Sequence, residues 1–130
     1  MVELARDDLD VGLVAFDVAA MLRFYGDALG LPSAGKMKVP GIGTIHRFGV
    51  GASVLKVLEP EVPTTSRPVG GPPQAAAGVR YVTLHVTNLA AALDELGSPT
   101  VAGPEEPVPG IRYAIVADPD GNCVELVEGA

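Results

Sequence analysis

Glu125 lies in the middle of a short apolar strand pattern, where a carboxylate is costly to bury. Such a carboxylate usually binds a metal ion, pairs with a cation or transfers a proton. The Asp-Pro-Asp-Gly motif at 118–121 predicts a tight hairpin before this strand, because proline presets φ at the second turn position and glycine adopts the positive φ that follows. Strand alternation then places Cys123 on the face of Glu125, and Val124 and Leu126 on the other face.

Two histidines and one arginine are further candidates for chemistry, although their spacing is not diagnostic. His85, in a strand pattern at 81–88, is either a general base or an imidazole satisfied in the core or at the rim. The sequence does not determine which face of the sheet each residue of the strand pattern at 44–48 points to. His46 is therefore a candidate ligand contact and Arg47 a candidate anion contact. The sequence contains no defensible Ser-His-Asp or Cys-His arrangement and no phosphate-binding glycine loop.

Composition narrows the class of protein. The 130 residues suffice for one compact unit or two very small modules sharing a core, and 48% of them are apolar. No run approaches the roughly 20 apolar residues of a membrane span, and the acidic N-terminus lacks the apolar segment of a secretory signal. The net charge of −7 argues against nucleic-acid binding, and the single cysteine suits a reducing compartment. We therefore expect a cytoplasmic protein that binds neither nucleic acid nor a membrane.

The elements that position the candidate residues follow one plan twice. A strand pattern ends at Asp17, a helix N-cap residue, and the apolar spacing that follows predicts a helix over 18–29. A second strand pattern ends at Asn88, again a cap residue, and precedes a shorter helix that Gly97 stops. The two cap residues are 71 positions apart. An internal repeat indicates the fold more strongly than any single propensity.

The ends of the two halves repeat as well. The segment 51–59 aligns with 120–128 at an offset of 69 residues, which matches Lys56 with Glu125. Each half reads as a strand, a helix and three strands, and the Pro-, Gly-, Ala- and Ser-rich segment between them is predicted as a surface linker. We predict one α+β domain of two tandem βαβββ modules. The predicted bounds are 9–60 for module one, 61–77 for the linker and 78–130 for module two.

This doubled plan, with Phe-Tyr at 24–25, Leu-Gly-Leu at 29–31 and the closing segment 118–126, resembles the vicinal oxygen chelate superfamily. That superfamily includes glyoxalase I, extradiol dioxygenases, methylmalonyl-CoA epimerase, fosfomycin-resistance enzymes and bleomycin-binding resistance proteins. The resemblance covers residues 9–128 and implies a curled mixed sheet around a cleft, often in a homodimer. It does not choose among these activities, because one fold carries many different sites.

The resemblance also implies four positions for metal ligands. Metal-using members usually place His or Gln at the start of the first strand, Glu or His in the last strand of module one, His at the start of module two and Glu in the closing strand. The corresponding residues are Asp10, Lys56, Tyr81 and Glu125. Only Glu125 keeps the usual type, and an ammonium group at Lys56 repels a metal ion. We therefore expect no cofactor, with Zn, Ni, Mn or Fe as the alternative if Asp10 and Glu125 are ligands.

Strand alternation places these four residues, together with His85, on the faces expected to line the cleft. We hypothesise that Lys56 replaces the metal by neutralising Asp10 or Glu125, which relieves the cost of desolvating the carboxylate. In the alternative interpretation Lys56 extends to solvent, Glu125 is a structural salt-bridged carboxylate and Tyr81 is an ordinary strand aromatic.

Three functions remain open at this point. The first is metal-independent binding or sequestration of an apolar or aromatic metabolite or antibiotic, as in the bleomycin-resistance branch, although few aromatic residues are present to stack on such a ligand. The second is a metal-free glyoxalase-like lyase, epimerase or isomerase, in which a proton is transferred next to a carbonyl. The candidates for this transfer are Lys56, Glu125, Tyr81 and His85. The third is a metal-dependent lyase, epimerase or dioxygenase, which ranks last because of Lys56.

Overall fold

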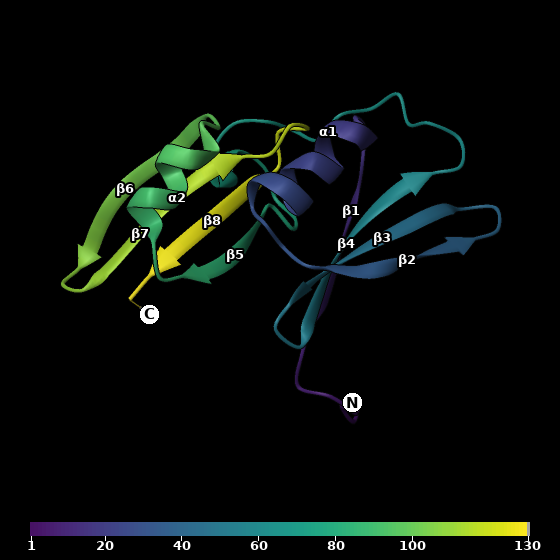
Figure 1. The fold of residues 1–130 in the computed structure, drawn as a ribbon, viewed down its shortest axis with the longest axis horizontal. Helices are drawn as coiled ribbons and strands as arrows, with labels where there is room; N and C mark the ends of the chain where they lie inside the picture. The colour runs from purple at the N-terminus through teal and green to yellow at the C-terminus, as the bar shows by residue number, and fades with distance from the viewer. Residues whose placement is uncertain (130) are drawn as a thin grey trace. The chain divides into compact units, whose positions relative to one another are not determined.

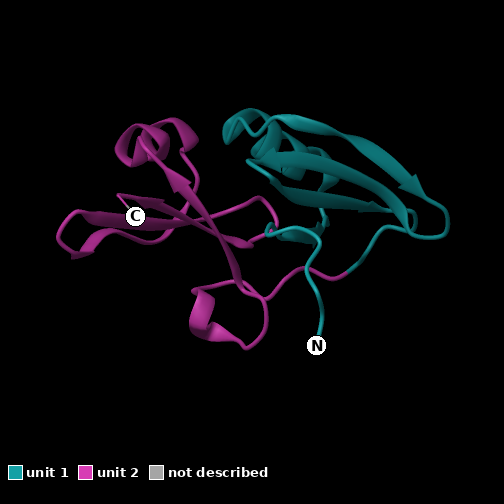
Figure 2. Cartoon of the chain, turned by 90° about the horizontal axis from the view of Figure 1, so that it is seen from below, with its two compact units in different colours: residues 1–65 teal, residues 66–130 magenta. Residues whose placement is uncertain are grey.

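The chain folds as two compact units of equal length, residues 1–65 and 66–130, which Figure 2 shows in separate colours. A computed structural model describes residues 1–129. Each unit contains the predicted strand, helix and three further strands, so the fold is α+β with two βαβββ modules. The boundary between the units lies inside the segment 61–77 that the sequence analysis assigns to the linker.

The first unit is a four-stranded sheet with a helix on one face. The strands lie in the order β1-β4-β3-β2, with β1 parallel to β4 and the other neighbours antiparallel. The helix α1 packs against β4 (Figure 1), and Met21, Tyr25, Leu55 and Val57 are almost completely buried. The elements are β1 (Asp10–Val14), α1 (Val18–Arg23), η1 (Phe24–Ala28), β2 (Ser33–Val39), β3 (Gly43–Val50) and β4 (Ser53–Pro60).

The first helix begins where the sequence predicts and changes its winding on the way. Asp17 accepts a hydrogen bond from the backbone N–H of Ala20 at 3.2 Å, as expected of an N-cap. The chain is α-helical in α1 and π-helical in η1, and Gly30 follows with a φ of +71°, a conformation that favours glycine. The predicted helix is confirmed in extent, but its apolar spacing did not indicate the π-helical half.

The second unit repeats this arrangement with the strand order β5-β8-β7-β6. Here β5 is parallel to β8, and α2 contacts β7 and β8. Gly97 ends α2 with a φ of +58°, as predicted. The elements are η2 (Pro73–Ala75), β5 (Tyr81–Val86), α2 (Leu89–Leu96), β6 (Thr100–Val108), β7 (Ile111–Ala117) and β8 (Cys123–Glu128).

The register of the strands confirms the internal repeat residue by residue. Asp10 pairs with Val54 in unit one, and Tyr81 pairs with Cys123 in unit two. Two residues further along, Gly12 is opposite Lys56 and Thr83 is opposite Glu125. Lys56 and Glu125 are therefore structurally equivalent, as are Asp10 and Tyr81.

The second predicted helix cap has the expected position but not the expected hydrogen bond. Asn88 occupies the N-cap position of α2, but its side chain makes no capping hydrogen bond. Instead, Oε1 of Glu128 accepts a hydrogen bond from the backbone N–H of Leu89 at 2.9 Å. The reason is tertiary: β8 ends beside the start of α2, so a carboxylate 39 residues away in the chain supplies the acceptor.

Part of the predicted linker is attached to unit two. The guanidinium of Arg80 donates to the carbonyl oxygens of Val69 at 2.9 Å and Pro73 at 3.1 Å. The thiol of Cys123 donates to the carbonyl oxygen of Gly71 at 3.4 Å. Residues 69–73 are thus held against the start of β5 and β8. None of the helices formed by residues 1–129 has the length and hydropathy needed to cross a membrane.

Candidate functional site

Each sheet has one face turned away from its helix, and most of the candidate residues lie there. In β4 the side chain of Lys56 is 35% exposed, whereas its neighbours Leu55 and Val57 are buried beneath α1. In β8 Glu125 points away from the buried side chains of Val124 and Leu126. We call these surfaces the open face of unit one (Asp10, Gly12, Arg47 and Lys56) and the open face of unit two (Tyr81, Thr83, His85, Tyr113 and Glu125).

Asp10 and Lys56 form a charge pair on the open face of unit one. The ammonium Nζ of Lys56 lies 3.4 Å from Oδ2 of Asp10, and the backbone N–H of Val54 donates to Oδ1 of Asp10 at 3.2 Å. Both side chains are about one-third exposed, so the pair contributes on the order of 0.2–1 kcal/mol to stability. Within unit one, the hypothesised neutralisation of a carboxylate by Lys56 therefore takes Asp10 as its partner.

His46 and Arg47 lie on opposite faces of the first sheet. Arg47 is directly opposite Lys56 in the β3–β4 register, so it shares the open face. His46 lies on the helix side, where its Nε2 is 3.0 Å from Oε1 of Glu59. The structure thus brings Arg47, Lys56 and Asp10 together and separates His46 from them.

Glu125 is held by a hydroxyl on the open face of unit two. The Oγ1 of Thr83 donates a hydrogen bond to Oε1 of Glu125 at 2.8 Å. Thr83 was not among the predicted site residues, although it lies two residues after Tyr81 in the predicted strand and therefore shares its face. A hydroxyl donor fixes one carboxylate oxygen and leaves the other able to accept a proton or a hydrogen bond.

Tyr113 is a second polar residue on this face that sequence analysis did not select. Its hydroxyl donates to Oε2 of Glu105 at 2.9 Å. This hydrogen bond raises the pKa of Tyr113, and the negative charges of Glu105 and Glu125 raise it further, because both disfavour the phenolate. The pairing of Glu105 with Tyr113 follows register shifts in β6, so no sequence pattern revealed it.

Tyr81 and His85 flank Thr83 on β5, on the same open face. Tyr81 is 52% exposed, and His85 is also exposed. In the register His85 is opposite Val127, two pairs beyond the Thr83–Glu125 pair. Among residues 1–129, His85 makes no hydrogen bond to Glu125, so the two predicted catalytic residues share one face without a hydrogen bond between them.

Cys123 is buried, in surroundings that disfavour its thiolate. It is 3% exposed, at the end of the sheet that residues 69–73 contact. Burial raises the pKa of the Cys123 thiol, and the nearby charge of Arg80 lowers it by a smaller amount. The prediction of a buried thiol is confirmed.

The predicted turn before β8 is also confirmed. The backbone N–H of Gly121 donates to the carbonyl oxygen of Asp118 at 2.9 Å, and Gly121 has a φ of +96°. The carboxylate of Asp118 is 4% exposed and accepts from the backbone N–H groups of Asp120 and Asn122. This turn fixes where β8 begins and hence on which face Glu125 lies.

The residues at the four positions where metal-using members of the superfamily have ligands do not suit a divalent transition metal. These residues are Asp10, Lys56, Tyr81 and Glu125. In unit one the carboxylate of Asp10 is shared with the ammonium of Lys56, which occupies a ligand position and repels a cation. In unit two a tyrosine stands at the third position, and Glu125 is engaged by Thr83. Among the residues that the structure describes, no three His, Cys, Asp or Glu residues are grouped to hold a metal ion.

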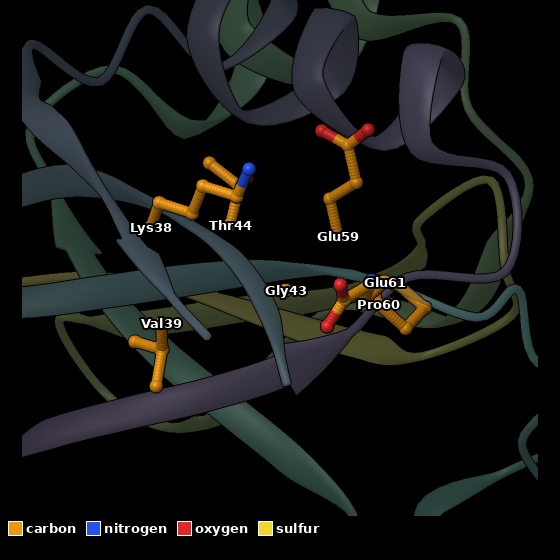
Figure 3. A pocket seen from close by; sticks show the side chains of 7 residues that line it. All are labelled: Lys38, Val39, Gly43, Thr44, Glu59, Pro60 and Glu61. Atoms are coloured by element: carbon orange, nitrogen blue, oxygen red, sulfur yellow. The ribbon is translucent and has the colours of Figure 1, made fainter. Parts of the chain in front are cut away.

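A shallow pocket lies at the edge of the first sheet, away from the predicted residues. Its volume of about 160 Å³ is smaller than the roughly 300–1,000 Å³ of a typical ligand site. Figure 3 shows Lys38, Thr44 and Glu59 extending to one side of the strands and Val39 to the other. Because Glu59 contacts His46 and the pocket is small and open, we do not assign a ligand to it.

Comparison with known proteins identifies the family. Residues 9–126 match the model of the Glyoxalase/Bleomycin resistance protein/Dioxygenase superfamily. The protein SMU.1112c is similar in structure, with a TM-score of 0.76 and 22% identity over 96% of this chain and 100% of that one. A comparison with curated proteins gave no significant match.

Two further solved structures have described functions. The trypanothione-dependent glyoxalase I of Leishmania major has a TM-score of 0.72 and 22% identity, over 96% of this chain and 88% of that one. TnmS3, an antibiotic-binding protein from Streptomyces sp. CB03234, has a TM-score of 0.72 and 18% identity, over 98% of this chain and 100% of that one. This chain belongs to the Glyoxalase/Bleomycin resistance protein/Dioxygenase superfamily, and the fold alone does not select an activity within it.

Proposed function

We propose that this protein binds a small organic molecule on the open faces of its sheets, without a resident metal ion, and releases it unchanged. Sequestration of an apolar or aromatic metabolite or antibiotic is the specific form of this proposal. The observation that carries it is the contact of 3.4 Å between Lys56 and Asp10, at two positions where metal-using relatives place ligands. A charge pair there supplies the electrostatic balance that a bound cation supplies elsewhere.

The open faces have the polarity that a binding protein needs. They carry a few charged and hydroxyl side chains together with Tyr81 and Tyr113, while the side chains buried beneath the helices are apolar. Small-molecule sites typically combine an apolar wall with few polar groups that orient the ligand. The same fold occurs in a glyoxalase I and in an antibiotic-binding protein, so it is compatible with either outcome. We further propose a cytoplasmic homodimer, in keeping with the single cysteine and with the family resemblance.

The first test measures what the purified protein carries. After mild purification, native mass spectrometry is expected to show the protein with an organic ligand or without one. Elemental analysis is expected to show less than one equivalent of Zn, Ni, Mn or Fe per chain. The bound molecule should be recovered with its mass unchanged after prolonged incubation. Stoichiometric transition metal that restores an activity lost to a chelator would overturn the proposal.

Metal-free proton transfer is a second candidate, and the hydrogen bond from Thr83 to Glu125 favours it. A carboxylate held at 2.8 Å by one hydroxyl presents its second oxygen in a fixed direction, as a general base requires. If the protein turns over a carbonyl compound, Glu125→Gln should abolish turnover and retain binding. Thr83→Val, which removes only the orienting hydroxyl, should lower kcat more than it raises KM. Unchanged turnover in Glu125→Gln would rule this candidate out.

A further inference from the structure

The open face of unit one is positively charged in a unit that is acidic overall. Residues 1–65 contain six basic and eight acidic residues. On the strands of the open face, however, two cations, Arg47 and Lys56, are present with one carboxylate, Asp10. At the rim of this face Arg6 is balanced by Asp8, whose Oδ2 lies 2.8 Å from its guanidinium. The face therefore retains an excess of positive charge at Arg47 and Lys56.

The two cations occupy directly opposed positions on neighbouring strands. Arg47 on β3 pairs with Lys56 on β4, and like charges at such positions repel each other. Lys56 is partly neutralised by Asp10, but Arg47 is half-buried and makes no ion pair among residues 1–129. A bound anion would offset the repulsion between the two cations, because it would lie between their positive charges. It would also give Arg47 an ionic partner by accepting hydrogen bonds from the guanidinium.

Open space lies next to these cations. Gly12 is opposite Lys56 on the other side of β4, so Gly12, Lys56 and Arg47 form one row across three strands. A Cβ atom added to Gly12 would meet no atom within 4 Å. The missing side chain therefore leaves access to the Lys56 ammonium from the side opposite Arg47.

We propose that the ligand of this protein carries an oxyanion, either a carboxylate or a phosphate. Arg47 and Lys56 bind this group on the open face of unit one, over the row that they form with Gly12. This inference rests on the proposed function, since it defines the chemical class of the ligand for the same site. Asp10 is an internal competitor: it holds the Lys56 ammonium in the free protein and shares it with the ligand when the anion binds.

Titration with matched anionic and neutral probes tests the proposal. Benzoate and phenyl phosphate are added to the full-length, ¹⁵N-labelled protein, with benzamide as the neutral counterpart of benzoate, and binding is followed from amide shifts in β3 and β4. At least one anion should bind more tightly than benzamide, and the stronger of the two identifies carboxylate or phosphate as the preferred group. Arg47→Gln and Lys56→Met should each weaken its binding by about tenfold or more, as expected for charged hydrogen bonds.

Three further variants separate local from general effects. Lys36→Met removes the same charge from the other face of the sheet, where Lys36 is opposite His46, and should leave binding unchanged. Gly12→Val fills the open space without changing the charge, and valine is well suited to a strand. This variant should weaken binding. Asp10→Asn should strengthen binding about two- to fivefold, because it removes a competitor of modest energy. A gain of affinity cannot arise from an unfolded variant.

The outcomes also distinguish this inference from the proposed function. Equal binding of benzoate and benzamide, equal losses in Lys36→Met and Lys56→Met, or weaker anion binding in Asp10→Asn would each overturn the inference. If the purified protein instead retains a neutral organic molecule, the proposed function stands and the oxyanion does not. A stoichiometric metal without any organic ligand would overturn both.

Discussion

Glu128→Ala should destabilise the protein more than its position at the end of the last strand suggests. Oε1 of Glu128 accepts the hydrogen bond of the Leu89 backbone N–H at the start of α2, and its side chain is only 29% exposed. Leu89 itself is fully buried, so water cannot easily replace the lost acceptor. Loss of an N-cap acceptor costs about 0.5–2 kcal/mol, and loss of a negative charge at a helix N-terminus costs about 0.3–1 kcal/mol. The contact of 3.9 Å with Arg112 adds little.

The expected decrease in the free energy of unfolding is therefore about 1–2.5 kcal/mol, measured by urea denaturation monitored by circular dichroism. Asn88→Ala changes the residue at the N-cap position itself and should cost less than about 0.5 kcal/mol, because its side chain makes no capping hydrogen bond. Glu95→Ala, which removes the same charge from an exposed position in α2, is the control. A larger loss in Asn88→Ala than in Glu128→Ala would refute the assignment of the cap.

Three further predictions follow from single contacts. Asp17→Ala should lower the free energy of unfolding by about 1 kcal/mol in the same urea assay, because it removes the side-chain cap of α1. The pKa of Tyr113 is raised in the folded state, so the stability that this hydroxyl contributes is present below its ordinary pKa near 10 and is lost as the pH rises through the folded value. Ultraviolet titration of the phenolate should show the raised pKa, and Glu105→Gln should reduce the shift. Cys123 should react with a thiol reagent much more slowly in the native protein than in urea, because burial raises its pKa; equal rates would contradict its burial beneath residues 69–73.

The fold was predictable because the same order of elements is repeated in the two halves of the sequence. The matched positions of Asp17 and Asn88, and of Lys56 and Glu125, gave the order of elements, and the strand registers agree with that alignment. Alternation in β8 also predicted which face carries Glu125, since the neighbouring Val124 and Leu126 leave no doubt about the buried side. Local pattern was sufficient wherever one face of an element is clearly apolar.

The sequence was insufficient where the contact depends on a distant strand. His46 and Arg47 are adjacent polar residues, and only the pairing of β3 with β4 decides that Arg47 shares the face of Lys56. The acceptor for the start of α2 comes from Glu128 rather than from Asn88, because tertiary packing brings the end of β8 to the helix. Thr83 shares the face of Tyr81 by strand alternation, so its place beside Glu125 could be predicted from the sequence.

The anchoring of residues 69–73 determines where this chain can be divided. The composition of the segment suggests that everything from 61 to 77 could be discarded as a spacer. A second half that began at Tyr81 would lose Arg80 together with its backbone acceptors at Val69 and Pro73, and would uncover the thiol of Cys123. An excised C-terminal half should therefore start before Val69, close to the unit boundary after residue 65. Part of the sequence that resembles a spacer is thus a structural component of the second module.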